Sequence, residues 1–464
     1  MCNCKAVLRG YAMYRLAKYL IIGLKKDISH TLYSAWQSGV GKNAASLYLI
    51  QFANYILPLI LVPYLVRVLR PEFFGLVSFG QGLIAYFNIL VDYGFALSAT
   101  RRISVERNDL VAVSKTASSI WAAKGLFCLL GLCILLLLTK TGPKFQKLDH
   151  FFLILYGTVV GGALFPIWLF QGMEKMFFIS LINLSMRLII VAFVFLLVRN
   201  PEHYLLYAAL TSLGAIGAGL IGMIVAIFKF RIRLILPSFE DIKQVLKEGW
   251  FLFLSTASIS LYTAGNAFIL GLLTNPTVVG YYSAAEKIVK GVVNLLGPVR
   301  EAAYPRFSKL ALESKAKTLY WVKRLMLVMS GLGLLLSLAL FLGAPLIVNL
   351  LLGSEYRPSV GILRVLAGVP LLVAMSNVLG IQIMLPFGKD RAFMAILFGA
   401  GLTNIAFAML LAPRLQAIGM ATAVLLSETF VTTSMFIYLQ QCGLNPLSRK
   451  FSQTQSLLGQ EGNK

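Results

Sequence analysis

Residues 43 to 107 contain two apolar runs, the first ending near Val68 and the second reaching Asp92, with the short break Leu69-Arg-Pro-Glu72 between them. Each run is long enough to cross a bilayer, since about 20 residues of α-helix span roughly 30 Å. Polar residues interrupt both runs: Gln51, Asn54, Gln81, Asn88 and Asp92. Such side chains turn away from lipid. The pattern therefore predicts a helical hairpin with one polar line facing the interior of a bundle.

The rest of the chain repeats this pattern of apolar runs and short polar breaks. Twelve runs are found, at 44–66, 73–98, 116–138, 150–170, 177–198, 203–228, 250–273, 278–299, 322–342, 360–385, 392–411 and 417–440. The pattern predicts an all-α integral membrane protein with twelve transmembrane helices.

Composition supports a membrane protein. The chain has 464 residues, of which 58% are hydrophobic and 13% charged, and its mean hydropathy is +0.80. Soluble proteins are nearer 45–50% apolar and about 25% charged. The net charge of +24 would suggest nucleic acid in a soluble protein, but a multi-pass protein collects Lys and Arg in its cytoplasmic loops. We therefore expect no nucleic-acid partner.

The distribution of basic residues predicts the orientation. With the N-terminus inside, and with Lys323 and Arg324 at the edge of the ninth run counted with the loop before it, the internal segments hold 29 of the 42 Lys and Arg residues and the external segments hold 8. This split predicts that both termini are cytoplasmic. Residues 1–42 are then a basic cytoplasmic extension, either an amphipathic helix on the inner membrane face or a disordered segment. The further alternative is that the start has been assigned upstream of a true start at Met13.

The two halves of the chain resemble each other. Gly75, at the start of the second run, has a counterpart in Gly280 at the start of the eighth, and Gln171-Gly-Met-Glu-Lys175 has one in Phe387-Gly-Lys-Asp-Arg391. Six spans per half give both halves the same orientation. We expect an N-lobe at 43–228, a cytoplasmic linker at 229–249, a C-lobe at 250–440 and a cytoplasmic tail at 441–464. A binding site between pseudo-symmetric lobes is typical of alternating access.

Enzyme signatures are absent from the sequence. It has no phosphate-binding Gly-rich loop with Lys-Ser/Thr, no His-Glu-x-x-His and no Gly-x-Ser-x-Gly. Cys2 and Cys4 have no His or Cys nearby that would complete a zinc site. We expect a transporter with no metal and no cofactor. The short external loops also argue against a glycan polymerase or transferase.

Ionisable residues inside the runs are the candidate site. A charge at mid-bilayer costs about 2.5–3.5 kcal/mol on insertion scales, so these groups face water or a partner. The basic residues are Lys124, Arg187, Lys287, Lys290 and Arg364, and the acidic ones are Asp92, Glu286 and Glu428. An excess of cations suits an anionic substrate such as a phosphate. The acids are candidates for a coupling proton or Na⁺, or for ion pairs; Glu286 and Lys290 have the i,i+4 spacing of such a pair.

Asparagines recur through the same runs. Asn54, Asn88, Asn266 and Asn294 are candidates to line a cavity for a hydroxyl-rich sugar, and the alternative is that each joins neighbouring helices.

Several short motifs, in order and spacing, resemble the bacterial polysaccharide-export flippases. These are O-antigen repeat-unit translocases, in the superfamily that includes multidrug-and-toxin extrusion (MATE) transporters and the lipid II flippase. The motifs are Asn43, Gln51-x-x-Asn54, Pro58, Pro63-Tyr64, Arg67, Pro71-Glu-Phe-Phe-Gly75, Asp92-Tyr-Gly94, Arg101, Phe170-Gln-Gly172-x-Glu174, Gly280-Tyr-Tyr-Ser-Ala-Ala-Glu-Lys287, Pro298, Tyr304-Pro-Arg306 and Pro386-x-Gly-Lys-Asp390. The likeness extends over about 43–440. The sequence departs from the pattern in its long N-terminus and in Arg70, where a small residue is common.

This resemblance implies a MATE-like fold of two six-helix lobes in a V shape, in the bacterial inner membrane. It also implies a substrate, an undecaprenyl-diphosphate-linked oligosaccharide, flipped from the cytoplasmic to the periplasmic leaflet for O-antigen, capsule or exopolysaccharide assembly. The diphosphate would then meet the basic residues above, and the polysaccharide polymerase machinery would be a possible contact. The alternative within the superfamily is an ion-coupled drug or organic-cation antiporter, which the excess of intramembrane cations argues against.

Overall fold

The computed structural model describes residues 40–263 and 265–446, and every regular element within those ranges is a helix. Residues up to Ile56 and residues from Leu57 onward form two compact units. The first unit contributes only the start of helix α2 to the described chain. All contacts below lie in the second unit. The expected amphipathic or disordered segment at 1–42 and most of the expected tail at 441–464 lie outside the described residues.

The helices follow one another with short breaks. They are α2 (Val40–Asp92), α3 (Phe95–Glu106), α4 (Leu110–Thr141), α5 (Pro143–Gln146), α6 (Asp149–Leu164), α7 (Ile167–Gly172), α8 (Met176–Leu197), η1 (Pro201–His203), α9 (Tyr204–Phe228), α10 (Phe239–Thr263), α11 (Asn266–Leu273), α12 (Pro276–Asn294), α13 (Gly297–Glu313), α14 (Lys315–Ile347), η2 (Val348–Leu352), η3 (Ser354–Tyr356), α15 (Ser359–Leu366), α16 (Val369–Leu379), η4 (Gly380–Met384) and α17 (Asp390–Gln441).

Helix α2 contains the predicted hairpin break. Arg70 has φ 57° and ψ 170°, which is not helical, and the chain kinks there. The next residue is Pro71, whose fixed φ suits the first position of a helix. The predicted separation of the first two spans near residues 69–72 is therefore confirmed. Helix α17 has a similar kink at Gln416, between the last two predicted spans.

The twelve predicted runs all coincide with helices. Among the described residues, eight helical stretches are long and apolar enough to cross a membrane, and one of them, Ile60–Glu106, continues through the kink of α2. The seventh predicted run corresponds to α10 and α11, and the run after it corresponds to α12 and α13. None of these four helices is among the membrane-spanning candidates of the described residues. Helix α12 carries Glu286, Lys287 and Lys290, which lower its hydropathy. The all-α transmembrane fold is confirmed.

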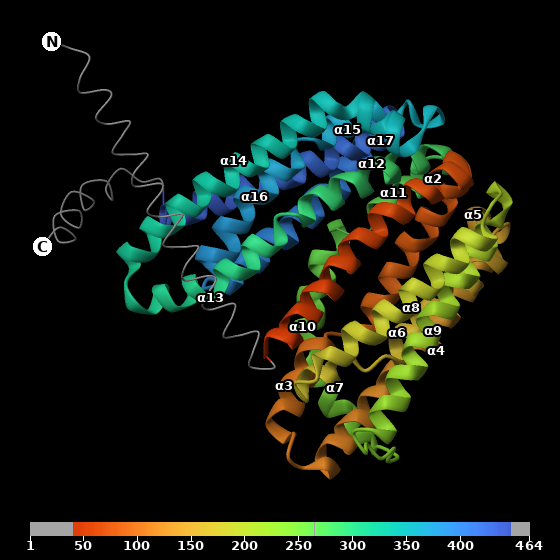
Figure 1. The fold of residues 1–464 in the computed structure, drawn as a ribbon, viewed down its shortest axis with the longest axis vertical. Helices are drawn as coiled ribbons and strands as arrows, with labels where there is room; N and C mark the ends of the chain where they lie inside the picture. The colour runs from red at the N-terminus through yellow and green to blue at the C-terminus, as the bar shows by residue number, and fades with distance from the viewer. Residues whose placement is uncertain (1–39, 264, 447–464) are drawn as a thin grey trace, which may run out of the picture. The chain divides into compact units, whose positions relative to one another are not determined.

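Small residues bring the helices together. Helix α6 packs on α9, and a Cβ on Gly161 of α6 would lie 2.5 Å from the Ala215 carbonyl oxygen. Helix α9 also packs on α8, and α14 packs on α16, which in turn packs on α17. Figure 1 draws α14, in teal, as a long helix beside α16. Close backbone approach at small residues is the usual packing of membrane helices.

The two turns predicted to correspond have the same backbone structure. After α7, the Lys175 amide donates to the Phe170 carbonyl at 2.8 Å, and Glu174 has φ 56°. After η4, the Lys389 amide donates to the Met384 carbonyl at 2.8 Å, and Gly388 has φ 66°. Each is a Schellman motif with a left-handed residue at C′. The same turn is therefore found at both places, but two residues away from the predicted register, because Glu174 and not Gly172 takes the position of Gly388.

The second half of the predicted 229–249 linker is helical. Helix α10 begins at Phe239, where the Ser238 hydroxyl accepts from the Asp241 amide at 3.2 Å and the Ser238 amide donates to the Asp241 carboxylate at 3.2 Å. This reciprocal pair resembles a capping box. Helix α10 packs on α3 and α4. The domain boundaries themselves stay a prediction.

Candidate functional site

Lys287 lies in helix α12, and its side chain reaches α2. Its ammonium is 4.6 Å from the centre of the Phe74 ring and 3.4 Å from the Gln81 Oε1 atom. The residue is half-buried. Within the part of the chain that the structure describes, no carboxylate oxygen lies within 4.0 Å of this ammonium. Lys287 is thus a half-buried cation between segments more than 200 residues apart, held by a ring and an amide.

The other two ionisable residues of α12 form a pair. The Lys290 ammonium lies 3.1 Å from the Glu286 carboxylate, and the Tyr282 hydroxyl donates to the same carboxylate at 3.2 Å. The i,i+4 ion pair considered from the sequence is therefore present. Lys290 is half exposed, whereas only 14% of the Glu286 side chain is exposed. Lys287, one turn away, does not share that carboxylate.

Gln81 connects Lys287 to the first half of the chain. Its side chain also interacts with the Tyr207 hydroxyl of α9, which has Arg187 of α8 as an electrostatic neighbour. Tyr207 is buried and Arg187 is exposed. Lys287 thus contacts Gln81, and Arg187 acts electrostatically on Tyr207, the other member of the pair. Gln81 was predicted to be a polar residue of the second span, but the sequence contains no signal for its partners.

Lys124 and Asp92 form an ion pair of their own. The Lys124 ammonium donates to Asp92 Oδ1 at 2.8 Å, and only 2% of the Lys124 side chain is exposed, against 55% for Asp92. The following residue, Tyr93, stacks on Phe127 and Phe253 with ring centres 4.9 Å apart in each case. The Asp-Tyr-Gly motif therefore fixes the end of α2 between α4 and α10.

The remaining charged residues lie apart from Lys287. The Arg364 guanidinium is 5.8 Å from the centre of the Phe341 ring, and the residue is exposed. Glu428 is half-buried in α17, and within the described chain its carboxylate has no hydrogen bond or ion pair. The structure thus divides the predicted site residues among several locations.

The predicted asparagines are also dispersed. Asn266 is 3% exposed at the start of α11, and its side chain interacts with Tyr282. Asn88 is half-buried and faces Gly162 of α6, whereas Asn294 is exposed at the end of α12. Asn54 lies in α2, but its side chain is outside the described residues. Of these asparagines, Asn266 is the one next to the group formed by Tyr282, Glu286 and Lys290, which we call the Glu286 cluster.

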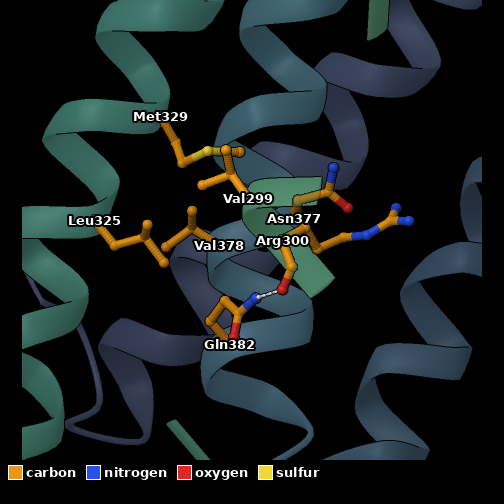
Figure 2. A pocket seen from close by; sticks show the side chains of 7 residues that line it. All are labelled: Val299, Arg300, Leu325, Met329, Asn377, Val378 and Gln382. Carbon is orange, nitrogen blue, oxygen red and sulfur yellow. Dashed lines mark hydrogen bonds between the residues drawn. The ribbon is translucent and has the colours of Figure 1, made fainter. Parts of the chain in front are cut away.

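A small pocket lies at the junction of α13, α14 and α16. Figure 2 shows the seven side chains that line it, mostly apolar, with the Gln382 amide donating to the Arg300 carbonyl at 2.9 Å. None of the predicted site residues lines it. In the described residues no group of three His, Cys, Asp or Glu side chains could hold a metal ion.

Comparison with known proteins agrees with this architecture. Residues 40–311 match the family model described as "Polysaccharide biosynthesis protein". The chain is 33% identical over 402 residues to a "Putative O-antigen transporter" of Escherichia coli (strain K12), covering 86% of this chain and 96% of that protein. A protein of the same name from Shigella dysenteriae is 28% identical, over 85% of this chain and 98% of that protein.

Solved structures share the fold at low sequence identity. "Lipid II flippase MurJ, inward closed conformation" superposes with a TM-score of 0.70 at 14% identity, covering 85% of this chain and 87% of that one. The inward-facing conformation of a MATE-family multidrug resistance transporter gives a TM-score of 0.63 at 14% identity, covering 85% and 96%. The predicted MATE-like fold is therefore confirmed.

Proposed function

Because the chain belongs to the polysaccharide biosynthesis protein family, we propose that it is a flippase for lipid-linked oligosaccharides. In this proposal it moves an undecaprenyl-diphosphate-linked repeat unit from the cytoplasmic to the periplasmic leaflet by alternating access. Two relatives named as O-antigen transporters and a fold shared with a lipid II flippase support it. The protein is a multi-pass membrane protein, and we propose the bacterial inner membrane as its location.

The observation that carries the proposal is the position of Lys287. Its ammonium lies between α12 and α2, in contact with Phe74 and Gln81, and in the described chain no carboxylate oxygen lies within 4.0 Å of it, although the neighbouring Glu286 acts on it electrostatically. An ammonium has three N–H donors, and only Gln81 accepts from this one in the described chain, so it can also bind an anion. A diphosphate crossing bare hydrocarbon would lose its hydration at prohibitive cost. We propose that Lys287 supplies part of the replacement solvation.

The other predicted cations then have different roles. Arg187 is the second diphosphate ligand in our proposal, because it acts electrostatically on Tyr207, the partner of Gln81. Lys290 would bind the diphosphate only by giving up Glu286, and Lys124 only by giving up Asp92. Arg364 has no contact with these residues in the described chain, so we give it no role in diphosphate binding.

The acidic and amide side chains complete the proposal. Glu428 is our first candidate for the coupling proton or Na⁺, because its carboxylate has no partner in the described chain, and Glu286 and Asp92 are occupied by lysines. Asn266, beside the Glu286 cluster, is the first candidate for a glycan contact. Transport needs no covalent step, so the protein is proposed to be a transporter and not an enzyme, with contact to the polymerase machinery at its external face.

The test is complementation of a strain that lacks its own O-antigen transporter. The variant Lys287→Met keeps the length of the side chain and removes its charge, and should reduce surface O-antigen by about tenfold or more, the equivalent of one charge-assisted contact. Lys287→Arg should retain part of the activity. Arg187→Met should show a smaller loss.

Lys229→Met is the matched control. The Lys229 ammonium also lies 4.6 Å from a phenylalanine ring, that of Phe178, but at the end of α9. The Lys229→Met variant should restore surface O-antigen fully in the same strain. Full O-antigen display by a membrane-inserted Lys287→Met variant would refute the diphosphate assignment. If the unsubstituted chain exports cationic drugs and fails to restore O-antigen, the antiporter alternative is correct.

A further inference from the structure

A lysine from the first half of the chain caps a helix of the second half. Lys144 lies in the short helix α5, between α4 and α6, and its ammonium donates to the carbonyl oxygens of Gly271, Leu272 and Thr274 at 3.0, 2.8 and 2.9 Å. These carbonyls are at the end of α11 and just beyond it. By the predicted orientation, this contact is on the external side of the membrane.

The contact completes an otherwise deficient helix end. The last four carbonyls of a helix have no partner inside it. In α11 the Leu270 carbonyl accepts from the Thr274 amide at 2.9 Å and from its hydroxyl at 2.7 Å, and Lys144 provides donors to Gly271 and Leu272. A cation at this end is also favoured by the helix dipole. Lys144 therefore contributes to a cap that the α11 sequence does not supply.

The residue next to Lys144 is buried at the same junction. Phe145 is 7% exposed, and its ring centre lies 5.4 Å from that of Phe152 and 6.5 Å from that of Phe268 in α11. Phe268 also stacks on Phe79 of α2, with ring centres 5.2 Å apart. Helix α5 thus holds α11 through an apolar contact and a charged contact at adjacent positions.

Two further basic residues, Arg67 and Arg70, also join the two halves. The Arg67 guanidinium, near the end of the first span, donates to the Leu350 carbonyl in η2. Arg70, one turn further on, lies 3.7 Å from the Glu355 carboxylate in η3. By the predicted topology, both of these contacts lie in external loops or at the external ends of spans. Basic residues before residue 150 therefore contact main-chain carbonyls after residue 260 at two places.

We propose that Lys144 is a positioning residue for transport, which holds the external ends of the two halves together and releases α11 when the protein opens outward. This inference rests on the proposed alternating access, because opening to the outside must separate α5 from α11. On release, water replaces the ammonium at the carbonyls of Gly271 and Leu272. Lys144 thereby sets how often the external side opens.

The first test measures the external opening directly, without any substrate. Spin labels at Lys140→Cys and Arg357→Cys, both exposed positions in the predicted external segments, report the distance between the halves in nanodiscs, in a background with the natural cysteines replaced by serine. Replacing Lys144 with Ala should raise the population of the long distance about tenfold, the equivalent of one hydrogen bond to a charged group. Lys144→Arg should restore most of the short distance.

Lys147→Ala is the matched control, since Lys147 is an exposed lysine three residues away with no contact recorded in the described chain. It should leave the distribution unchanged. An unchanged distribution in a folded Lys144→Ala variant would overturn the proposal. So would an equal shift caused by Lys147→Ala.

The second test asks whether the contact between α5 and the end of α11 must open for transport. Lys144→Cys and Thr274→Cys, joined by a reducible bifunctional thiol reagent in the same cysteine-free background, should block O-antigen display, and a reducing agent should restore it. Display that continues in the cross-linked protein would show that this contact need not open. The spin-label result is independent of the substrate, so failure of the flippase assignment would leave it intact.

Discussion

Gly75 and Gly280 pack against each other's helices in a reciprocal way. A Cβ on Gly75 would overlap the Pro276 carbonyl oxygen and lie 2.7 Å from the Gly280 nitrogen, and a Cβ on Gly280 would overlap the Pro71 carbonyl oxygen. Each glycine is four residues after a proline that opens its helical segment. The two sequence positions that first indicated the repeat are therefore in direct contact, where equivalent helices from the two halves cross.

Replacing either glycine should separate this crossing. Gly75→Ala or Gly280→Ala places a methyl group against backbone atoms, which cannot move as a side chain can, and we expect a loss of about 1–3 kcal/mol in stability. Thermal unfolding in detergent measures it. Gly125→Ala and Gly331→Ala are the matched controls, because a Cβ at either meets nothing within 4 Å. Alanine should stabilise those helices slightly. Equal effects at all four positions would contradict the crossing described here.

The Lys124–Asp92 pair should respond asymmetrically to substitution. Asp92→Asn leaves the ammonium of Lys124, which is almost fully buried, without a counter-ion, and breaking such a pair typically costs about 3 kcal/mol. Lys124→Met leaves Asp92, whose side chain is 55% exposed, in contact with water, and should cost about 1 kcal/mol.

Chemical unfolding of the two single variants and the double variant measures the difference. The double variant should be more stable than Asp92→Asn alone. If Asp92→Asn is the milder of the two changes, Lys124 does not depend on that carboxylate, and its assignment as a diphosphate ligand gains support.

The start of α10 should be sensitive to acid. Hydrogen bonds from Lys115 and Ser238 hold the pKa of the Asp241 carboxyl below its usual value. Because the pKa is lower in the folded state, this contribution to stability is fully present above about pH 4, the unfolded value. It decreases as the pH falls through the folded pKa.

Hydrogen exchange of the first turn of α10 can follow this change. Exchange should accelerate beyond the intrinsic pH dependence as the pH falls below about 4, and Asp241→Asn should give fast exchange already at neutral pH. Glu240→Gln is the control, since the Glu240 side chain is 78% exposed and its nearest cation, Lys243, is 3.9 Å away. A pH profile that Asp241→Asn leaves unchanged would be inconsistent with this assignment.

The fold could be predicted from the sequence because its signals are local. Span-length apolar runs, the Arg70-Pro71 break and the i,i+4 spacing of Glu286 and Lys290 each act over a few residues, and the structure contains all three. The partners across helices could not be predicted. Lys124 and Asp92 were both expected inside spans but with separate roles, since nothing in a single sequence pairs residues on different helices.

Lys144 illustrates the same limit more strongly. In the sequence it is one basic residue of a short external loop, and its carbonyl partners are main-chain groups that carry no residue-type signal. Its role depends on where α11 ends and on how α5 approaches it. Both are properties of the assembled helices.

The cap on α11 has a consequence for biosynthesis. The ribosome releases α5 well before α11, so Lys144 is already in the membrane when the carbonyls of Gly271 and Leu272 arrive. A carboxy-terminal half made alone would insert with that helix end uncapped. The end of α11 in the second half of the chain is therefore completed by a residue of the first half, which is synthesised earlier.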